Sequence, residues 1–285
     1  MTLAVVTDSA ACLPAESCAR HGIVVVPLHH TGGGSGDASS AGGREPATSR
    51  PSVEELEQAY REAAQRADEV LAVHVSGVLS GTVDNARLAA SRLNDDRPGL
   101  VRVLDSASCS GALALAVLAA SQAQDARRGA ALARESLARS YQFFVVDDLR
   151  HLARSGRIDL TTARLGGVLG VRPVLSVQPE GIRAVETVRG GARARRHMVA
   201  QAVRAAGGTA LRGPRRPADP VLLALQAPGP DLPGLREEVD AAMARSGARV
   251  AQVLTLPVDK ALEVHLGPGA TGIAVAPRLL VRVRT

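Results

Sequence analysis

The sequence predicts an α/β protein built from two α/β domains. Short apolar runs separated by helical patterns, such as residues 70–75 and 100–104, are typical of buried parallel strands. Near residue 155 this alternation gives way to a hairpin pattern, which indicates a second domain. A chain of 285 residues with 46% hydrophobic content is long and apolar enough for two cores.

The first domain is predicted to span residues 1–155 and to hold a largely parallel sheet flanked by helices. Its expected strands are the apolar runs at 3–6, 23–28, 70–75, 100–104 and 143–146. Its expected helices begin near Val53, Thr82 and Ser110. Ser52 and Glu55 fit a capping box for the first of these helices. The Gly/Ser-rich tract at 31–43 is expected to be a flexible loop.

The second domain is predicted to span residues 156–285 and to hold a mixed sheet with a hairpin and helices. The hairpin consists of segments 172–178 and 182–189 around a turn at Pro179-Glu180-Gly181. The other expected elements are a helix-like segment with Leu165, Val168 and Leu169, helices at 192–206 and 232–246, strands at 221–225 and 249–256, and an Arg/Pro-rich loop at 212–220.

Composition argues against several classes of protein. The aromatic side chains are Tyr60, Tyr141, Phe143 and Phe144, too few for a surface that stacks nucleic-acid bases. The net charge of +6 comes from arginines spread along the whole chain, and no nucleic-acid-reading motif is present, so we expect no nucleic-acid partner. The three cysteines lack C-x-x-C spacing, which argues against a disulfide framework or a zinc site, and we expect no metal.

The same reading predicts a cytoplasmic protein. The N-terminus has neither a basic region nor a site like that of a signal peptide. The longest apolar stretch, residues 111–120, is well short of the roughly 20 residues that a membrane span requires. We therefore expect no membrane span, and at most a transient contact with a membrane.

The most informative stretch is residues 74–82, in which Ser76, Ser80 and Thr82 accompany Gly77 and Gly81. It follows an apolar strand and opens a helical pattern, so backbone N–H groups, a helix N-terminus and hydroxyls converge there. Such a junction suits an anion, either a phosphate or a carboxylate. Polar residues also follow the strands that end near Asp8 and Asp105, which indicates a ligand site at this edge of the sheet.

Familiar catalytic motifs are absent or misleading. Residues 267–272 match G-x-G-x-x-G, but strand-like residues follow instead of a helix, so the glycines are better explained as a loop that presents His265. The single lysine, Lys260, does not follow a Gly-rich loop, which excludes a Walker A motif. No G-x-S-x-G elbow occurs. A phosphotransferase or hydrolase acting on a small phosphorylated or ester substrate through the Ser80 loop stays an alternative.

Single basic residues are ambiguous from sequence. A histidine such as His265 is more often structural than functional, and an isolated arginine such as Arg157 is usually solvated or caps a helix. The arginines at 189–196 have the spacing of an exposed helix face, with partner binding as the alternative.

Taken together, the motifs resemble the DegV family of bacterial proteins that bind fatty acids. The resemblance rests on Val-Thr-Asp-Ser at 6–9, Thr-Ser-Arg-Pro-Ser at 48–52, Leu-Ser-Gly-Thr at 79–82, Leu-Asp-Ser at 104–106, Leu-Ala-Arg-Ser-Gly-Arg-Ile at 152–158, Arg-Pro-Val-Leu at 172–175 before Glu180-Gly181, and His-Leu-Gly-Pro-Gly at 265–269. These motifs span nearly the whole chain. The chain departs from the family pattern at Arg50, where glutamine is usual.

The resemblance implies that a long-chain fatty acid lies between the two domains. Its carboxylate would be held by Thr48, Ser80, Arg157 and His265, with Ser49, Gly81 and Thr82 lining the same end. The resemblance further implies that the protein is not itself an enzyme. It would present the acyl carboxylate to an ATP-dependent kinase subunit, as the binding subunit of a bacterial fatty acid kinase does, and would need no cofactor.

Overall fold

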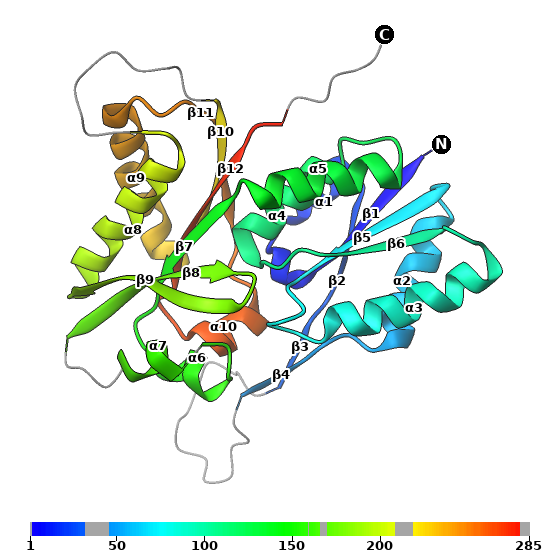
Figure 1. The fold of residues 1–285 in the computed structure, drawn as a ribbon, viewed down its shortest axis with the longest axis horizontal. Coiled ribbons are helices and arrows are strands. Elements are labelled where there is room, and N and C mark those ends of the chain that lie inside the picture. Colours follow the sequence, from blue (N-terminus) through cyan, green and yellow to red (C-terminus); the bar gives the residue numbers. More distant parts are fainter. Residues whose placement is uncertain (1, 32–45, 159, 166–169, 209–218, 280–285) are drawn as a thin grey trace.

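Two β-sheets lie side by side, with helices packed around both (Figure 1). The computed structural model describes residues 2–31, 46–158, 160–165, 170–208 and 219–279. Strands alternate with helices in the first part of the chain, and a hairpin opens the mixed sheet in the second part. The predicted fold class, α/β with a parallel and a mixed sheet, is confirmed.

The first sheet is parallel throughout the part of the chain that is described. Its strands lie in the order β2-β1-β5-β6. They are β1 (Leu3–Asp8), β2 (Ile23–Val26), β5 (Glu69–His74) and β6 (Val101–Asp105). Each pairs in parallel with its neighbour, so all four end at the same edge. Ligands bind at this edge in open α/β sheets.

Helices cover both faces of the first sheet. Successive apolar side chains of its strands point to opposite faces, so both faces are apolar. They are α1 (Ala15–His21), α2 (Val53–Ala64), α3 (Thr82–Asp96), α4 (Ser110–Ala120) and α5 (Ala126–Ala138). Val6 on β1 packs in one core with α2 and α3, and its neighbour Val5 packs in another with α4 and α5. The predicted capping box is present: Glu55 N–H donates to Ser52 Oγ at 3.1 Å, and Ser52 N–H donates to Glu55 Oε2 at 2.7 Å.

The second sheet is mixed. Its described strands lie in the order β11-β10-β12-β7-β8-β9. They are β7 (Tyr141–Val145), β8 (Val171–Gln178), β9 (Gly181–Arg189), β10 (Val221–Gln226), β11 (Val250–Leu256) and β12 (Thr271–Pro277). Strands β10 and β11 pair in parallel, and the other pairs are antiparallel. The predicted hairpin is β8–β9.

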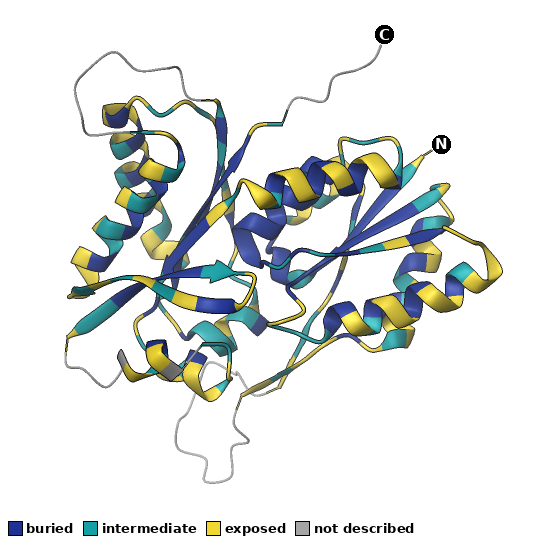
Figure 2. Ribbon diagram, viewed as in Figure 1, coloured by how far each residue is buried: buried dark blue, intermediate teal, exposed yellow. Residues whose placement is uncertain are grey.

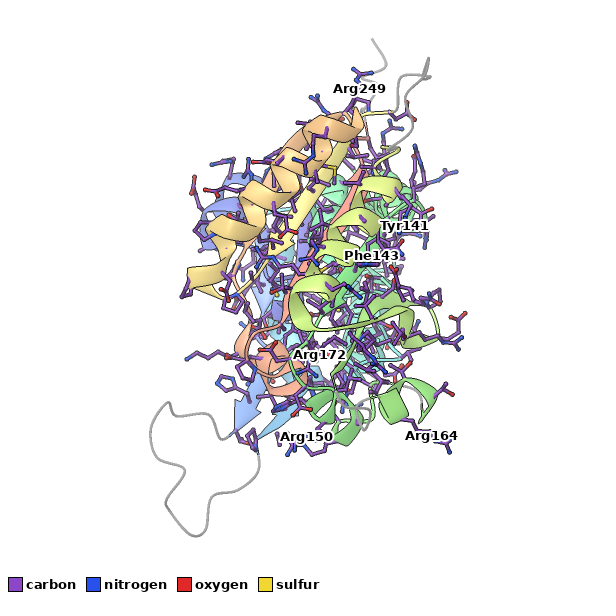
Figure 3. All side chains as sticks on the ribbon, turned by 90° about the vertical axis from the view of Figure 1, so that its left-hand side faces the viewer. Tyr141, Phe143, Arg150, Arg164, Arg172 and Arg249 are labelled. Carbon is purple, nitrogen blue, oxygen red and sulfur yellow. The ribbon has the colours of Figure 1, made fainter. Side chains whose placement is uncertain are left out.

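The two faces of the second sheet differ in the size of their side chains. One face carries Phe143, Leu223 and Ile273, and packs against α8 (Gly191–Ala205) and α9 (Leu232–Ser246). Phe143 also stacks with Tyr141, at a centroid distance of 6.4 Å (Figure 3). The opposite face carries small residues, notably Ala224, Gly272 and Ala274. Small side chains leave room on this face, which is turned toward the first sheet.

Helix α4 lies between the two sheets and belongs to both cores. All of its residues except Leu118 are buried, which Figure 2 shows as dark blue next to the exposed outer face of α5. Leu113 packs with the first sheet, and Ala114 and Leu115 pack with the second. A Cβ atom on Gly111 would lie 2.7 Å from Ala274 Cβ, so only glycine allows this approach.

The remaining described elements are short, and most of them gather near one end of the two sheets (Figure 1). They are η1 (Ser9–Ala11), β3 (His29–Thr31), β4 (Ala47–Ser49), α6 (Arg150–Arg154), α7 (Leu160–Leu165), η2 (Gly229–Asp231) and α10 (Lys260–Leu266). Strands β3 and β4 pair antiparallel. Within the described ranges, no helix has the length and apolarity needed to cross a membrane.

One expectation about an individual element was wrong. The run at 143–146 was expected in the parallel sheet, but β7 pairs antiparallel with β12 and β8. An apolar strand has the same appearance in sequence whichever sheet it joins, so composition could not assign it. The glycines after His265 form a turn, as expected, and Gly267 has φ of 75°. His265 itself lies in the last turn of α10, a helix that the sequence analysis did not predict. The division of the chain after residue 155 stays a prediction.

Some expected features fall on residues outside those described. The Gly/Ser-rich tract lies there except for Thr31, which is in β3. Val168, Leu169 and most of the Arg/Pro-rich loop also lie outside the described ranges.

Candidate functional site

A cavity of about 380 Å³ lies where the two sheets and α4 meet. This volume is in the range of pockets that hold small organic ligands. Most of its wall is apolar, and it includes the small residues Ala224, Gly272 and Ala274 from the second sheet. The wall residues with polar or charged side chains are Thr48, Ser49, Arg50, Ser80, Ser110, Gln142, Arg157, Gln226, His265 and Thr271.

The cavity brings together the residues predicted from the sequence. Thr48, Ser49, Ser80, Gly81, Arg157 and His265 all line it. Thr82 is fully buried beneath and contributes indirectly, because its Oγ1 lies 2.8 Å from Ser80 Oγ. These residues come from β4, the loop before α3, the turn after α6, and α10, which are far apart in the sequence. Their role in holding a ligand stays a prediction.

A hydrogen bond between Thr48 and His265 joins the β4 side of the cavity to α10. Thr48 Oγ1 lies 2.7 Å from His265 Nε2. His265 Nδ1 is buried and has no hydrogen-bond partner among the described residues. Burial and, second, the charge of Arg157 lower the pKa of His265 to about 4. The ring is therefore neutral near pH 7, with one nitrogen bonded to Thr48 and the other unsatisfied.

The Ser80 loop is a compact turn held from below. The N–H groups of Leu79 and Ser80 donate to Ser76 O at 3.0 and 2.9 Å. Gly77 N–H donates to the carboxylate of Asp105, at the end of β6. The loop thus presents Ser80 Oγ at the N-terminus of α3, where Gly81 is the N-cap residue. Ser80 Oγ is paired with the Thr82 hydroxyl rather than with a histidine, an arrangement that does not favour a serine nucleophile.

Arg157 is held by backbone carbonyls. Its Nε donates to Leu79 O at 3.3 Å, and one terminal nitrogen donates to Ser155 O. Burial lowers the pKa of this guanidinium, which nevertheless stays charged because arginine loses its proton only at very high pH. Among the described residues, no carboxylate forms an ion pair with Arg157. A partly buried cation of this kind favours an anionic ligand.

A buried network beneath the loop was missed by sequence reasoning. Asp8 accepts hydrogen bonds from His74 Nδ1 (2.9 Å), Val75 N–H (2.9 Å) and Ala10 N–H (3.1 Å). Tyr60 O–H donates to His74 Nε2 at 2.7 Å. Burial, and second the charge of Asp8, raise the pKa of Tyr60, which keeps the phenol protonated. Asp8, His74 and Tyr60 are completely buried, so this network supports the strand ends and does not contact a ligand.

The wall next to α4 and the second sheet carries a second polar group that the sequence did not reveal. Ser110 O–H donates to Gln226 Oε1 at 2.5 Å, and Gln226 Nε2 donates to Pro257 O at 2.7 Å. Gln142 Oε1 accepts from Ala112 N–H at 2.8 Å, which satisfies one N–H of the first turn of α4. The only signal in the sequence was a single polar residue in each of two apolar strands. These bonds hold α4 against the second sheet.

Comparisons with known proteins agree with this architecture. The family model for an uncharacterised protein of the DegV family matches residues 2–278. The chain therefore belongs to the DegV family. A DegV domain-containing protein from Deinococcus radiodurans is 33% identical, over 97% of this chain and 99% of the relative. Another from Streptomyces coelicolor is 32% identical, over 97% of this chain and 99% of the relative.

Solved structures of the DegV family have the same fold. One from Thermus thermophilus is a protein that binds fatty acid. It has a TM-score of 0.82 and 30% identity to this chain, with 97% of this chain and all of that protein covered. A DegV family protein from Corynebacterium glutamicum also has a TM-score of 0.82, with 26% identity, 99% of this chain covered and 98% of that protein.

Proposed function

We propose that this DegV family protein binds a long-chain fatty acid. Its carboxylate would lie among Thr48, Ser80, Arg157 and His265, and its tail would fill the apolar part of the cavity. The observation that supports this most directly is the composition of the cavity, which combines a largely apolar wall with a cluster of hydroxyls, a neutral histidine and a partly buried arginine. Fatty-acid binding by the relative from Thermus thermophilus supports the same ligand class.

The two ends of the fatty acid have different roles: the apolar tail contributes most of the affinity, and the carboxylate determines the orientation. Burial of each CH₂ group contributes ~0.8 kcal/mol, so a 16-carbon tail offers on the order of 10 kcal/mol before the cost of association. A carboxylate that leaves water needs several donors, which the Arg157 guanidinium and the Thr48 and Ser80 hydroxyls supply. His265 would complete this set with its ring proton on Nε2, because this N–H then donates to Thr48 Oγ1 and leaves the Thr48 hydroxyl proton for the carboxylate. The tail thus supplies affinity, and the polar end fixes the position of the carboxylate.

The finer part of the proposal is that the protein presents the bound carboxylate to an ATP-dependent kinase subunit, which converts it to an acyl phosphate. In this role the protein is a carrier with a lipid ligand, uses no cofactor and catalyses no step itself. Ser49 and Arg50 support it because both line the cavity and are exposed. A carboxylate beside them would be within reach of a second protein. Neutral hydroxyls hold such a carboxylate without neutralising its nucleophilic oxygen.

The ligand class can be tested directly on the purified protein. Extraction with organic solvent followed by mass spectrometry should release a long-chain fatty acid. The delipidated protein should bind added palmitate in a titration followed by displacement of a fluorescent fatty acid. A protein that carries no fatty acid and fails to bind palmitate would contradict the proposal. Incubation of the loaded protein with ATP and a candidate kinase then tests the finer part, with acyl phosphate as the readout.

A further inference from the structure

The cavity wall away from the carboxylate site is not wholly apolar. Gln142 on β7 and Ser110 at the start of α4 both line the cavity, and each is only 7% exposed. A plain hydrocarbon tail covers such groups without offering them a hydrogen bond, which costs free energy. The hydrogen bonds that these two side chains can still make therefore decide which kind of tail suits the cavity.

The strand register places Gln142 away from the carboxylate. Strand β12 follows the loop after His265, and strand β7 leads into α6 and Arg157, so the paired ends of these antiparallel strands are both at the carboxylate end of the cavity. Gln142 pairs with Ala274, three residues along β12 from Thr271. At about 3.3 Å per residue, it lies roughly 10 Å farther from that end. Gln142 is thus next to the middle of a bound acyl chain rather than its carboxylate.

The amide of Gln142 has a defined orientation and a spare donor. Its Oε1 accepts from Ala112 N–H at 2.8 Å, and because this backbone group can only donate, the amide nitrogen Nε2 lies on the other side. The partner of Nε2 is Cys109 Sγ at 3.6 Å, and a thiol sulfur is a weak acceptor. Nε2 carries two hydrogens, so at least one of them has no hydrogen-bond partner among the described residues.

Ser110 offers an acceptor and no donor. Gln226 Nε2 donates to Pro257 O at 2.7 Å, which turns Gln226 Oε1 toward Ser110. Ser110 uses its one hydroxyl hydrogen to donate to this oxygen at 2.5 Å, so only the lone pairs of its Oγ are left for a ligand.

The backbone of Ser110 is also unusual. Its φ of 48° is in the left-handed region, which residues other than glycine rarely adopt. Glycine would take this conformation without strain, so the serine side chain is present at a cost to stability. Such a cost is typical of a residue with a functional role.

We propose that Gln142 and Ser110 form a polar subsite inside the cavity, which selects an acyl chain with a hydroxyl group near its middle. A hydroxyl both accepts and donates, so it can accept from Gln142 Nε2 and donate to Ser110 Oγ. Both groups lie at the first turn of α4, because Gln142 is bonded there to Ala112 N–H. The inference rests on the proposed function and names the preferred member of its ligand class, a long-chain fatty acid hydroxylated in mid-chain.

The test compares stearate with 10-hydroxystearate and 12-hydroxystearate. The control ligand is 2-hydroxystearate, whose hydroxyl lies beside the carboxylate. Each affinity is measured by displacement of a fluorescent fatty acid from the delipidated full chain, and at least one mid-chain isomer should bind the wild-type protein as tightly as stearate or more tightly. Gln142→Met should lower the affinity of this isomer relative to stearate by about three- to tenfold, the effect of losing one hydrogen bond. The relative affinity of 2-hydroxystearate should not change.

A second variant tests the acceptor. Ser110→Gly removes the hydroxyl and suits the backbone conformation, so the protein should stay folded while the relative affinity of the mid-chain isomer falls by a similar factor. Gln122→Met, an exposed position beyond the far end of α4, is the matched control and should change neither relative affinity.

Two results would overturn the subsite. One is that both mid-chain isomers bind the wild-type protein more weakly than stearate does, and the other is a relative affinity that either Gln142→Met or Ser110→Gly leaves unchanged. Failure of the wild-type protein to bind stearate and its hydroxylated derivatives would instead overturn the proposed function.

Discussion

Ser80 is a half-buried hydroxyl whose neighbours already fix its position. Its Oγ lies 2.8 Å from Thr82 Oγ1, and the backbone of its loop is bonded to Ser76. Such a side chain can redirect its hydroxyl to a carboxylate without moving the loop. Loss of the hydroxyl should therefore weaken ligand binding and leave the loop's backbone bonds to Ser76 O in place.

We predict that Ser80→Ala lowers the affinity for palmitate by on the order of tenfold, the effect of losing one hydrogen bond to a charged group. The free energy of unfolding should fall by about 1 kcal/mol, because the buried Thr82 hydroxyl and Thr82 N–H lose their contacts with Ser80 Oγ, while the loop keeps its bonds to Ser76 O. Displacement of a fluorescent fatty acid measures the affinity. Ser121→Ala, which removes a hydroxyl bonded to Leu118 O at the far end of α4, is the matched control. Equal affinities in Ser80→Ala and wild type would place the carboxylate elsewhere.

His265 makes the stability of the ligand-free protein depend on pH. Burial lowers its pKa from 6.5 to about 4, so between these values the unfolded chain binds a proton that the folded chain excludes. The stabilisation by the neutral ring is complete above pH 6.5 and is lost as the pH falls toward 4.

We predict that the free energy of unfolding falls between about pH 7 and about pH 5, and that His265→Gln reduces this fall. Urea unfolding at the two pH values measures both proteins. His30→Gln, which changes an exposed histidine on β3, should behave as the wild type does. The assignment to His265 would be wrong if its variant lost as much stability as the wild type over the same range.

At the scale of elements, α4 packs closely against the second sheet. A Cβ atom on Gly111 would overlap Ala274 Cβ, on a face of the second sheet that is already filled with small residues. Gly191, at the start of α8, is different because a Cβ atom there would meet nothing within 4 Å. The two glycines therefore form a matched pair.

We predict that Gly111→Ala lowers the free energy of unfolding by about 1–3 kcal/mol through overpacking. Gly191→Ala should be neutral or stabilise the protein by up to about 1 kcal/mol, since alanine restricts the unfolded chain. Urea unfolding measures both variants. A Gly111→Ala protein as stable as the wild type would show that the two sheets can move apart to accept a methyl group.

At the scale of the whole molecule, the ligand should strengthen the association of the two sheets. The cavity wall comes from both, with Val75 following β5 and Phe144 from β7. A tail that contacts both sides stabilises only the folded arrangement. We predict that palmitate at about a hundredfold excess over its Kd adds about 2.7 kcal/mol to the free energy of unfolding. Thermal unfolding with and without palmitate measures this, and an unchanged midpoint for a protein shown to bind palmitate would contradict it.

Sequence reasoning was sufficient for the fold because most elements carry local signals. The Ser52–Glu55 capping box and the β8–β9 hairpin are both where the sequence placed them. Sequence reasoning was not sufficient to predict which strands pair when they are far apart in the sequence. The assignment of β7 to the second sheet depends on pairing with β12, about 130 residues later, and no property of residues 143–146 encodes it.

In the candidate site too, residues in local motifs could be predicted from the sequence, and contacts that depend on long-range packing could not. The motifs that carry the family resemblance located Thr48, Ser80, Arg157 and His265, which the structure places around one cavity. Tyr60 and His74 could not be paired from sequence, because their hydrogen bond depends on how α2 packs over β5. Gln142 and Gln226 were equally hidden, since each resembles an isolated polar residue in a strand.

The burial of α4 on all sides has a consequence for how the chain unfolds. A helix with one solvated face can remain folded when a neighbouring layer departs, but α4 would expose an apolar surface whichever sheet left it. Neither sheet with its helices can therefore melt alone without stranding this helix in water. The two α/β layers should lose their structure together, as a single cooperative unit, even though the chain is long enough for two independent ones.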